Sequence, residues 1–159
     1  METYISILRG INVSGQKKIL MADLKILYEN LQFEDVKTYI QSGNVVFKSE
    51  KKISDADTAK KIEDSIQKRY GFNVPVIIRS LREINKVIDS NPYLSKKNID
   101  LKKLHVTFLS EIPSKEKLQD LKSADFSPDE FTIKGKEIYL HIPVSYGETK
   151  LSIRFLRRN

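Results

Sequence analysis

Hydrophobic residues in the first 80 positions recur at spacings that switch between strand and helix periods. The stripe of Met21, Leu24, Leu27 and Leu31, for example, predicts an amphipathic helix. The whole pattern predicts a strand, a helix, two strands joined by a hairpin, a helix and a strand. We expect these elements at Tyr4–Leu8, Met21–Leu31, Val36–Ile40, Val45–Lys48, Asp55–Tyr70 and Val74–Arg79, with the hairpin turn at Gln41-Ser42-Gly43-Asn44.

The helix predicted at Asp55–Tyr70 has the clearest end signals. Ser54 precedes it as a cap, Lys68 and Arg69 occupy its last turn, and Gly71 follows. The resulting order, β-α-β-β-α-β, is the ferredoxin-like pattern.

A second series of elements follows a linker. Ser80 and Glu83 have the spacing of a capping box, which predicts a helix that Asn91-Pro92 ends. A lysine-rich connection then runs from Ser95 to Lys103. The later pattern predicts a strand at Leu104–Leu109 and a helix from Pro113-Ser114 to about Lys122. A hairpin of Glu130–Lys134 and Glu137–Ile142, joined by Gly135-Lys136, follows, and a last helix begins near Thr149.

The predicted fold class is therefore α+β, with two tandem ferredoxin-like (βαββαβ) halves and antiparallel sheets. We expect an N-terminal half at 1–79, a linker helix and lysine-rich loop at 80–103, and a C-terminal half at 104–159. The C-terminal half lacks the last strand of the plan, so we expect it to be truncated. The two halves match in element order and not in residues.

Composition narrows the class of protein further. The chain has 159 residues, no cysteine and a formal net charge of +7. The missing cysteines exclude disulfides and thiolate catalysis. The sequence shows no signal peptide and no apolar run of membrane-spanning length, so we expect a soluble cytoplasmic protein without membrane contact. The basic excess suits an anionic partner such as nucleic acid, or it only keeps lysine-rich helix faces soluble.

Three segments of the chain are distinctive: Leu8-Arg9-Gly10-Ile11-Asn12-Val13, Thr38-Tyr39-Ile40-Gln41-Ser42-Gly43-Asn44-Val45 and Thr149-Lys150-Leu151-Ser152. They resemble an uncharacterised, mainly bacterial family, domain of unknown function 1697. The chain departs from the family pattern at Ser14, Leu20 and Gln32, where the family usually has glycine, proline and glycine. Members also usually continue into a further C-terminal segment. The resemblance implies a ferredoxin-like build and no activity.

The first two of these segments define a candidate ligand site. Twelve residues, Arg9 to Leu20, join the first strand to the first helix, where about 2–6 are usual. In the ferredoxin-like plan this loop and the hairpin turn lie at one edge of the sheet. The loop contains no Asp or Glu, so the edge is rich in donors and suits phosphate or another anion. The predicted ligand-binding residues are Arg9, Asn12, Lys17, Lys18, Gln41, Ser42 and Asn44; Ser14 and Gln16 share the edge.

A structural interpretation of the same residues stays open. Asn12 and Asn44 can instead bond loop backbone, as asparagine does in tight turns, and the glycines can serve only backbone conformation. A second segment has two interpretations as well. It is either a helix N-cap or a small anion site, and its residues are Gly147-Glu148-Thr149-Lys150.

The two histidines, His105 and His141, raise a separate hypothesis. Each alternates with hydrophobic residues on its predicted strand, so we expect both on one sheet face, beside Tyr139. Either they form a functional pair or they are ordinary surface histidines. Two histidines make a poor metal site, and we expect no metal and no cofactor.

No nucleophile–base–acid set, zinc motif or dinucleotide fingerprint is present. The function favoured by the sequence is a binding module for an anionic, phosphate-bearing ligand or for nucleic acid. A small-molecule enzyme of unassigned reaction and an oligomerising or regulatory module, such as a homodimer, remain alternatives. Whether the protein is an enzyme is left open.

Overall fold

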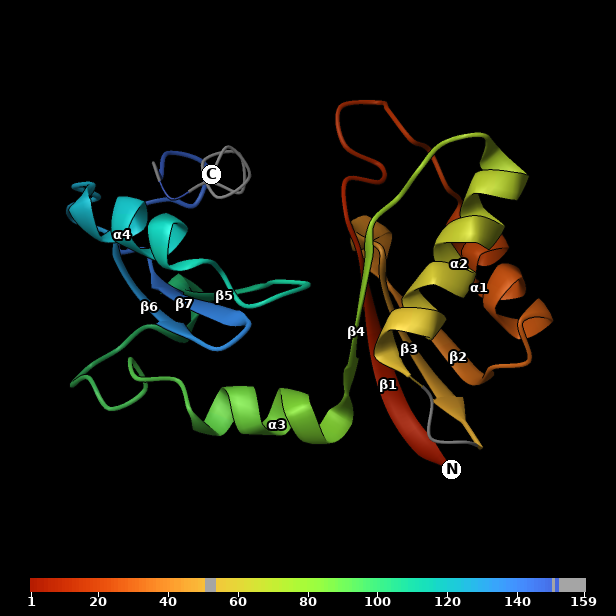
Figure 1. The fold of residues 1–159 in the computed structure, drawn as a ribbon, viewed down its shortest axis with the longest axis horizontal. Coiled ribbons are helices and arrows are strands. Elements are labelled where there is room, and N and C mark those ends of the chain that lie inside the picture. Colours follow the sequence, from red (N-terminus) through yellow and green to blue (C-terminus); the bar gives the residue numbers. More distant parts are fainter. Residues whose placement is uncertain (51–53, 150, 152–159) are drawn as a thin grey trace. The chain divides into compact units, whose positions relative to one another are not determined.

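The computed structural model describes residues 1–50, 54–149 and 151 (Figure 1). Its chain divides into two compact units, Met1–Lys86 and Val87–Asn159. Both units are α+β, with a four-stranded sheet in the first and a three-stranded sheet in the second. No helix in the described residues is long and apolar enough to cross a membrane.

The first unit has the predicted order of elements. These are β1 (Glu2–Leu8), α1 (Met21–Asn30), β2 (Glu34–Tyr39), the short 3₁₀ turn η1 (Ile40–Ser42), β3 (Asn44–Ser49), α2 (Asp55–Tyr70) and β4 (Val76–Ser80). The strands pair antiparallel in the order β2-β3-β1-β4. Strand alternation on β1 buries Tyr4, Ser6 and Leu8, so one face of the sheet carries the core.

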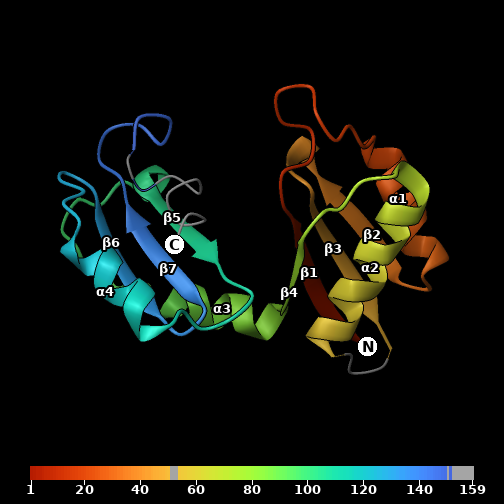
Figure 2. The ribbon, with the colours of Figure 1, turned by 45° about the horizontal axis from the view of Figure 1, so that its top comes forward.

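Helices α1 and α2 cover that core face (Figure 2). Leu24 and Tyr28 of α1 and Ile62 and Ile66 of α2 are fully buried with Phe47 of β3. Tyr28 pairs its hydroxyl with that of Ser6 at 2.7 Å, which satisfies two polar groups inside an apolar core. Burial raises the pKa of the Tyr28 phenol well above its ordinary value.

The ends of α2 form as their residues predict. The hydroxyl of Ser54 accepts a hydrogen bond from the backbone N–H of Asp57 at 3.4 Å. Gly71 ends the helix in the left-handed conformation, with φ of 78°. The capping box at the start of the next helix, α3 (Leu81–Asp89), also forms. Ser80 N donates to Glu83 Oε2 at 2.8 Å, and Glu83 N donates to Ser80 Oγ at 3.2 Å.

The second unit is a three-stranded antiparallel sheet in the order β5-β7-β6. Its elements after α3 are η2 (Leu101–Lys103), β5 (Leu104–Phe108), α4 (Lys115–Ser123), β6 (Glu130–Lys134) and β7 (Glu137–His141). These strands and α4 match the predicted ones within two residues. The predicted last helix, from near Thr149, falls almost entirely on residues 150 and 152–159, which lie outside the described residues.

Apolar residues cover both faces of this second sheet, which overturns the expectation for the histidines. Ile138 and Leu140 pack with Leu121 of α4 on one face, and Tyr139 packs with Val87 and Tyr93 on the other. In the β5–β7 register, His105 lies opposite Leu140, whereas His141 lies opposite Leu104. The two histidines therefore occupy opposite faces. The prediction was wrong because it placed both strands' hydrophobic residues on one shared core face.

Candidate functional site

The two motif segments of the first unit meet at one edge of the sheet. β1 and β3 pair antiparallel with Ile7 opposite Asn44, and Leu8 N donates to Gly43 O at 3.1 Å. The segment before β4 lies at the same edge, because Arg9 N donates to Pro75 O at 3.0 Å. We call this surface, made of 9–20, 39–44 and 72–75, the loop edge. The expected juxtaposition of the two motif segments is present.

Asn12 organises the long loop from within. Its side-chain Nδ2 donates to Ile19 O at 3.0 Å, and its Oδ1 accepts from Ile19 N at 2.9 Å. Its backbone N also donates to Lys17 O at 3.2 Å. Both halves of the amide are thus engaged in a clamp that joins the two ends of the loop. Of the two interpretations of Asn12, the contacts show the structural one.

The turn of the β2–β3 hairpin is tied down in the same way. Ser42 Oγ donates to Tyr39 O at 2.7 Å and accepts from Asn44 N at 3.4 Å. Gly43, with φ of 80°, lies against Ile11 of the long loop. These contacts hold the turn rigidly beside the loop, while Ser42 and Gln41 remain exposed.

Backbone strain concentrates at the loop edge. Seven non-glycine residues in the described part of the chain have positive φ, and four of them lie here: Asn12, Ser14, Lys17 and Ile40, at 53°, 51°, 45° and 44°. For Ile40 this conformation is especially unfavourable because its side chain is β-branched. Strained backbone of this kind gathers at ligand sites more than elsewhere.

The cations of the loop edge differ in their surroundings. Lys17 Nζ donates to Asn73 O at 2.6 Å, Lys18 is exposed, and Arg9 is half-buried. The three segments contain no Asp or Glu. Glu63 of α2 reaches the neighbouring start of β4, where its carboxylate accepts from Val76 N at 2.8 Å. The loop edge can therefore offer positive charge together with amide and hydroxyl groups.

Two features of this edge were missed from the sequence. The segment before β4 contributes the Asn73 carbonyl, and Tyr39 is left 66% exposed at the end of β2. The first could have been found from topology, since β4 begins at the edge where β1 ends. The second had a weaker signal in the alternation of Val36 and Thr38 with Lys37 and Tyr39.

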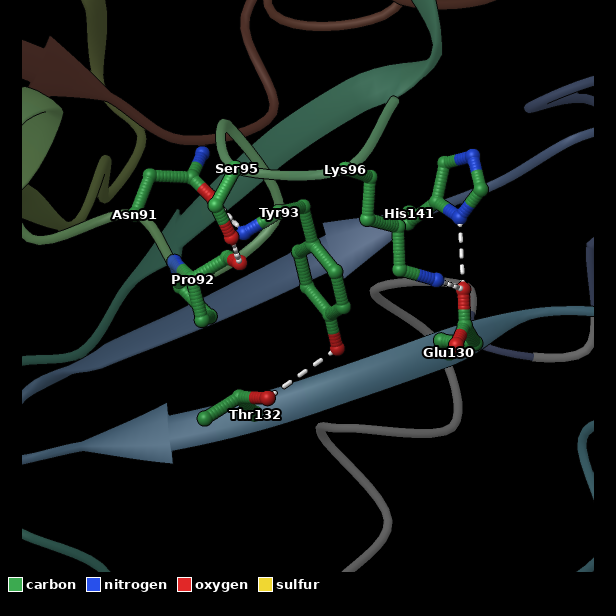
Figure 3. Close-up of polar contacts among 8 residues, drawn as sticks. All are labelled: Asn91, Pro92, Tyr93, Ser95, Lys96, Glu130, Thr132 and His141. Carbon is green, nitrogen blue, oxygen red and sulfur yellow. Dashed lines mark hydrogen bonds and ion pairs between the residues drawn. The ribbon is translucent and has the colours of Figure 1, made fainter. Parts of the chain in front are cut away.

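The second unit holds a different polar cluster, drawn in Figure 3. Glu130 Oε2 on β6 forms an ion pair with Lys96 Nζ and lies 2.6 Å from His141 Nδ1. Beside it, the Tyr93 hydroxyl lies 3.0 Å from Thr132 Oγ1. Hydrogen bonds from His141 and Lys96 hold the pKa of the Glu130 carboxyl below its ordinary value. An ionised carboxylate only accepts, so His141 Nδ1 carries the hydrogen.

This cluster fastens the segment Asn91–Lys96 onto the sheet. Tyr93 is buried against Tyr139, and burial raises the pKa of its phenol. Lys134 Nζ adds a hydrogen bond to Ser90 O at 2.8 Å. Every one of these polar groups is paired with another part of the same unit. Among the described residues, no group of three His, Cys, Asp or Glu side chains could hold a metal ion.

The fold and the loop edge define a two-unit α+β protein with a basic, polar loop at one edge of its first sheet. The family model described as "Protein of unknown function (DUF1697)" matches residues 1–139. The chain belongs to this family, and the resemblance read from the motif segments is confirmed. Membership assigns no function.

The fold is similar to a solved structure, that of the conserved bacterial protein SP0830 from Streptococcus pneumoniae. The two chains share 27% sequence identity with a TM-score of 0.75, over 93% of this chain and 82% of that chain. No curated protein sequence matches this chain significantly.

Proposed function

We propose that the loop edge binds an anionic, phosphate-bearing ligand. The observation that supports this most is the combination of a basic loop, neighbouring segments without carboxylates, and a strained and tightly braced backbone at one edge of the sheet. Arg9 and Lys18 supply charge, and Lys17 adds charge while it anchors the loop to Asn73. Gln41 and Asn44 supply directional hydrogen bonds from the turn, while Ser42, whose hydroxyl already donates to Tyr39 O, holds the turn in place.

Asn12 has an indirect role in this proposal. Its amide is occupied by Ile19, so it holds the shape of the loop and does not itself contact the ligand. A loop that is braced before the ligand arrives loses less conformational entropy on binding. The clamp is therefore compatible with a binding function for the neighbouring cations.

The architecture that carries this site is, we propose, the ferredoxin-like one. The strand order β2-β3-β1-β4 supports that plan for the first unit. The arrangement of β5, α4, β6 and β7 supports the same plan without its last strand for the second. The proposed divisions are 1–79, a linker at 80–103, and 104–159, in a cytoplasmic protein whose partner is a phosphate-bearing molecule or nucleic acid.

A phosphate titration of the intact 18.4 kDa chain, followed by backbone amide chemical shifts, tests the proposal. We expect the largest shifts in 9–20 and 40–44. Arg9→Ala should weaken binding roughly ten- to hundredfold, because a hydrogen bond to a charged group contributes about 1.5–3 kcal/mol. Lys97→Ala, which removes an exposed lysine from the second unit, is the matched control and should bind as the wild type does.

Two results would defeat this proposal. One is phosphate-dependent shifts confined to the lysine-rich connection at 95–103. The other is binding that Arg9→Ala leaves unchanged. A large loss of stability in Arg9→Ala would instead make Arg9 a structural clasp for the loop, and the binding role would be dropped.

A further inference from the structure

We infer that the ligand of the loop edge is a nucleotide unit, with its base stacked on Tyr39 and its phosphate held by Arg9 and the loop lysines. This inference rests on the proposed function and adds the chemical class of the ligand. It starts from the position of Tyr39 on the sheet.

Tyr39 is the most exposed of the seven tyrosines. Its side chain is 66% exposed, whereas Tyr4, Tyr28, Tyr93 and Tyr139 are each 6% exposed or less. Tyr146, the next most exposed at 40%, has a ring partner in His105 at 4.5 Å. No ring contact to Tyr39 occurs within the described part of the chain. A large aromatic left in water in this way is a ready stacking surface.

The backbone of Tyr39 is nevertheless fixed. Tyr39 is the last residue of β2 and pairs with Asn44 of β3, and its carbonyl accepts the Ser42 hydroxyl at 2.7 Å. The next residue, Ile40, has the strained φ of 44°. The ring is therefore exposed on a rigid element rather than on a loose loop, which keeps the entropy cost of stacking low.

The sheet register places the two halves of the proposed ligand site side by side. Tyr39 lies opposite Asn44, and Asn44 lies opposite Ile7, so these three residues cross β2, β3 and β1 on one face. Arg9 is the first residue after β1. Two interstrand spacings, roughly 10 Å, separate β2 from β1. A nucleotide covers such a reach between its base and its phosphate.

Asn44 lies between these two ends. Its half-buried side chain shares the face of Tyr39, and an amide can both donate to and accept from a base edge or a sugar hydroxyl. A simple oxyanion would leave the Tyr39 ring without a role. A nucleotide unit uses the cations, the amide and the ring together.

The experiment compares three probes on the intact chain: inorganic phosphate, adenosine 5′-monophosphate and adenosine. We expect the monophosphate to bind roughly tenfold or more tightly than phosphate, because stacking adds to the phosphate contacts. Tyr39→Ala should lower the affinity for the monophosphate roughly five- to hundredfold and leave that for phosphate unchanged. Tyr39→Phe keeps the ring and should bind like the wild type.

A monophosphate that binds no more tightly than phosphate overturns the inference, as does a Tyr39→Ala variant that binds it normally. In both cases phosphate binding that Arg9→Ala weakens leaves the proposed function standing. Absence of any Arg9-dependent phosphate binding overturns both. A ten-nucleotide single strand shows whether the nucleotide unit belongs to a nucleic acid or is free. If the strand binds more tightly than the monophosphate and its affinity falls steeply with salt, the ligand is a nucleic-acid strand. If its affinity equals that of the monophosphate, the ligand is a free nucleotide.

Discussion

Gly43 lies so close to Ile11 that a Cβ on the glycine would come within 2.9 Å of Ile11 Cδ1 and 3.0 Å of Leu8 Cβ. The contact joins the hairpin turn to the long loop across more than thirty residues of sequence. It explains why a glycine and a short strained turn occur together in one motif segment, and why the other segment carries a buried isoleucine at its centre.

We predict that Gly43→Ala destabilises the first unit by about 2–5 kcal/mol. The left-handed conformation costs an alanine about 1–2 kcal/mol, and overpacking against Ile11 and Leu8 adds about 1–3 kcal/mol. Urea denaturation followed by circular dichroism measures the loss. Gly10→Ala is the matched control, because Gly10 also has positive φ but has nothing within 4 Å of its Cβ position; it should lose only about 1–2 kcal/mol. Equal losses in the two variants would show that the Ile11 contact does not matter.

Asn12 provides a second test of the loop. Asn12→Gly keeps the positive φ favourable but removes both side-chain hydrogen bonds to Ile19, so it should cost about 1–3 kcal/mol. Hydrogen exchange of the Ile19 amide should accelerate, because Asn12 Oδ1 is its acceptor. An unchanged exchange rate at Ile19 would mean that the clamp does not hold in solution.

Most of the local structure could be predicted from the sequence. The α2 helix runs from Asp55 to Tyr70 as predicted, because Ser54, the charged end residues and Gly71 are all local signals. The capping box at Ser80 and the β6–β7 hairpin follow from local signals too.

What depended on tertiary structure was harder to predict. The faces on which His105 and His141 lie depend on whether one face or both faces of the sheet are covered. In a strand as short as β5, the spacing of hydrophobic residues does not distinguish these two cases. At the candidate site, the order of the elements was enough to predict that the two motif segments lie together. It could not predict which groups the polar side chains bond. Asn12 could equally have faced a ligand; only its distance to Ile19 shows that it braces the loop.

His105 should make the second unit sensitive to mild acid. Burial, and then the nearby Lys103, lower the pKa of the imidazole below its ordinary value. A lowered pKa in the folded state means that His105 adds stability above the unfolded pKa of about 6.5, and that this stability is lost as the pH falls through the folded pKa. We predict that the urea midpoint of the second unit drops between pH 8 and pH 5. His105→Gln should flatten that part of the profile; a profile identical to wild type would contradict this assignment.

Glu130 should act in a lower pH range. Hydrogen bonds from His141 and Lys96 lower its pKa, so its contribution is present above its unfolded pKa of about 4.3 and is lost as the pH falls through the folded pKa. We predict that Glu130→Gln weakens the attachment of the segment Asn91–Lys96 at pH 7, with faster amide exchange at Tyr93. Glu116→Gln is the control, because Glu116 lies on α4 away from that segment. Unchanged exchange at Tyr93 in Glu130→Gln would show that Tyr93 and its neighbours hold the segment without the carboxylate.

The central claim, an anion site at the loop edge, is tested most directly by the position of a bound oxyanion in a crystal. Crystals soaked in tungstate, a heavy analogue of phosphate, would give anomalous density that identifies each site. The account predicts a peak within hydrogen-bonding distance of Arg9 or Lys18 and of the Gln41 side chain. This peak should be stronger than any peak at the Ser95–Lys103 lysines, because Lys97 and Lys102 are exposed and well hydrated and Lys96 is already paired with Glu130. Peaks at those lysines with none at the loop edge would contradict it.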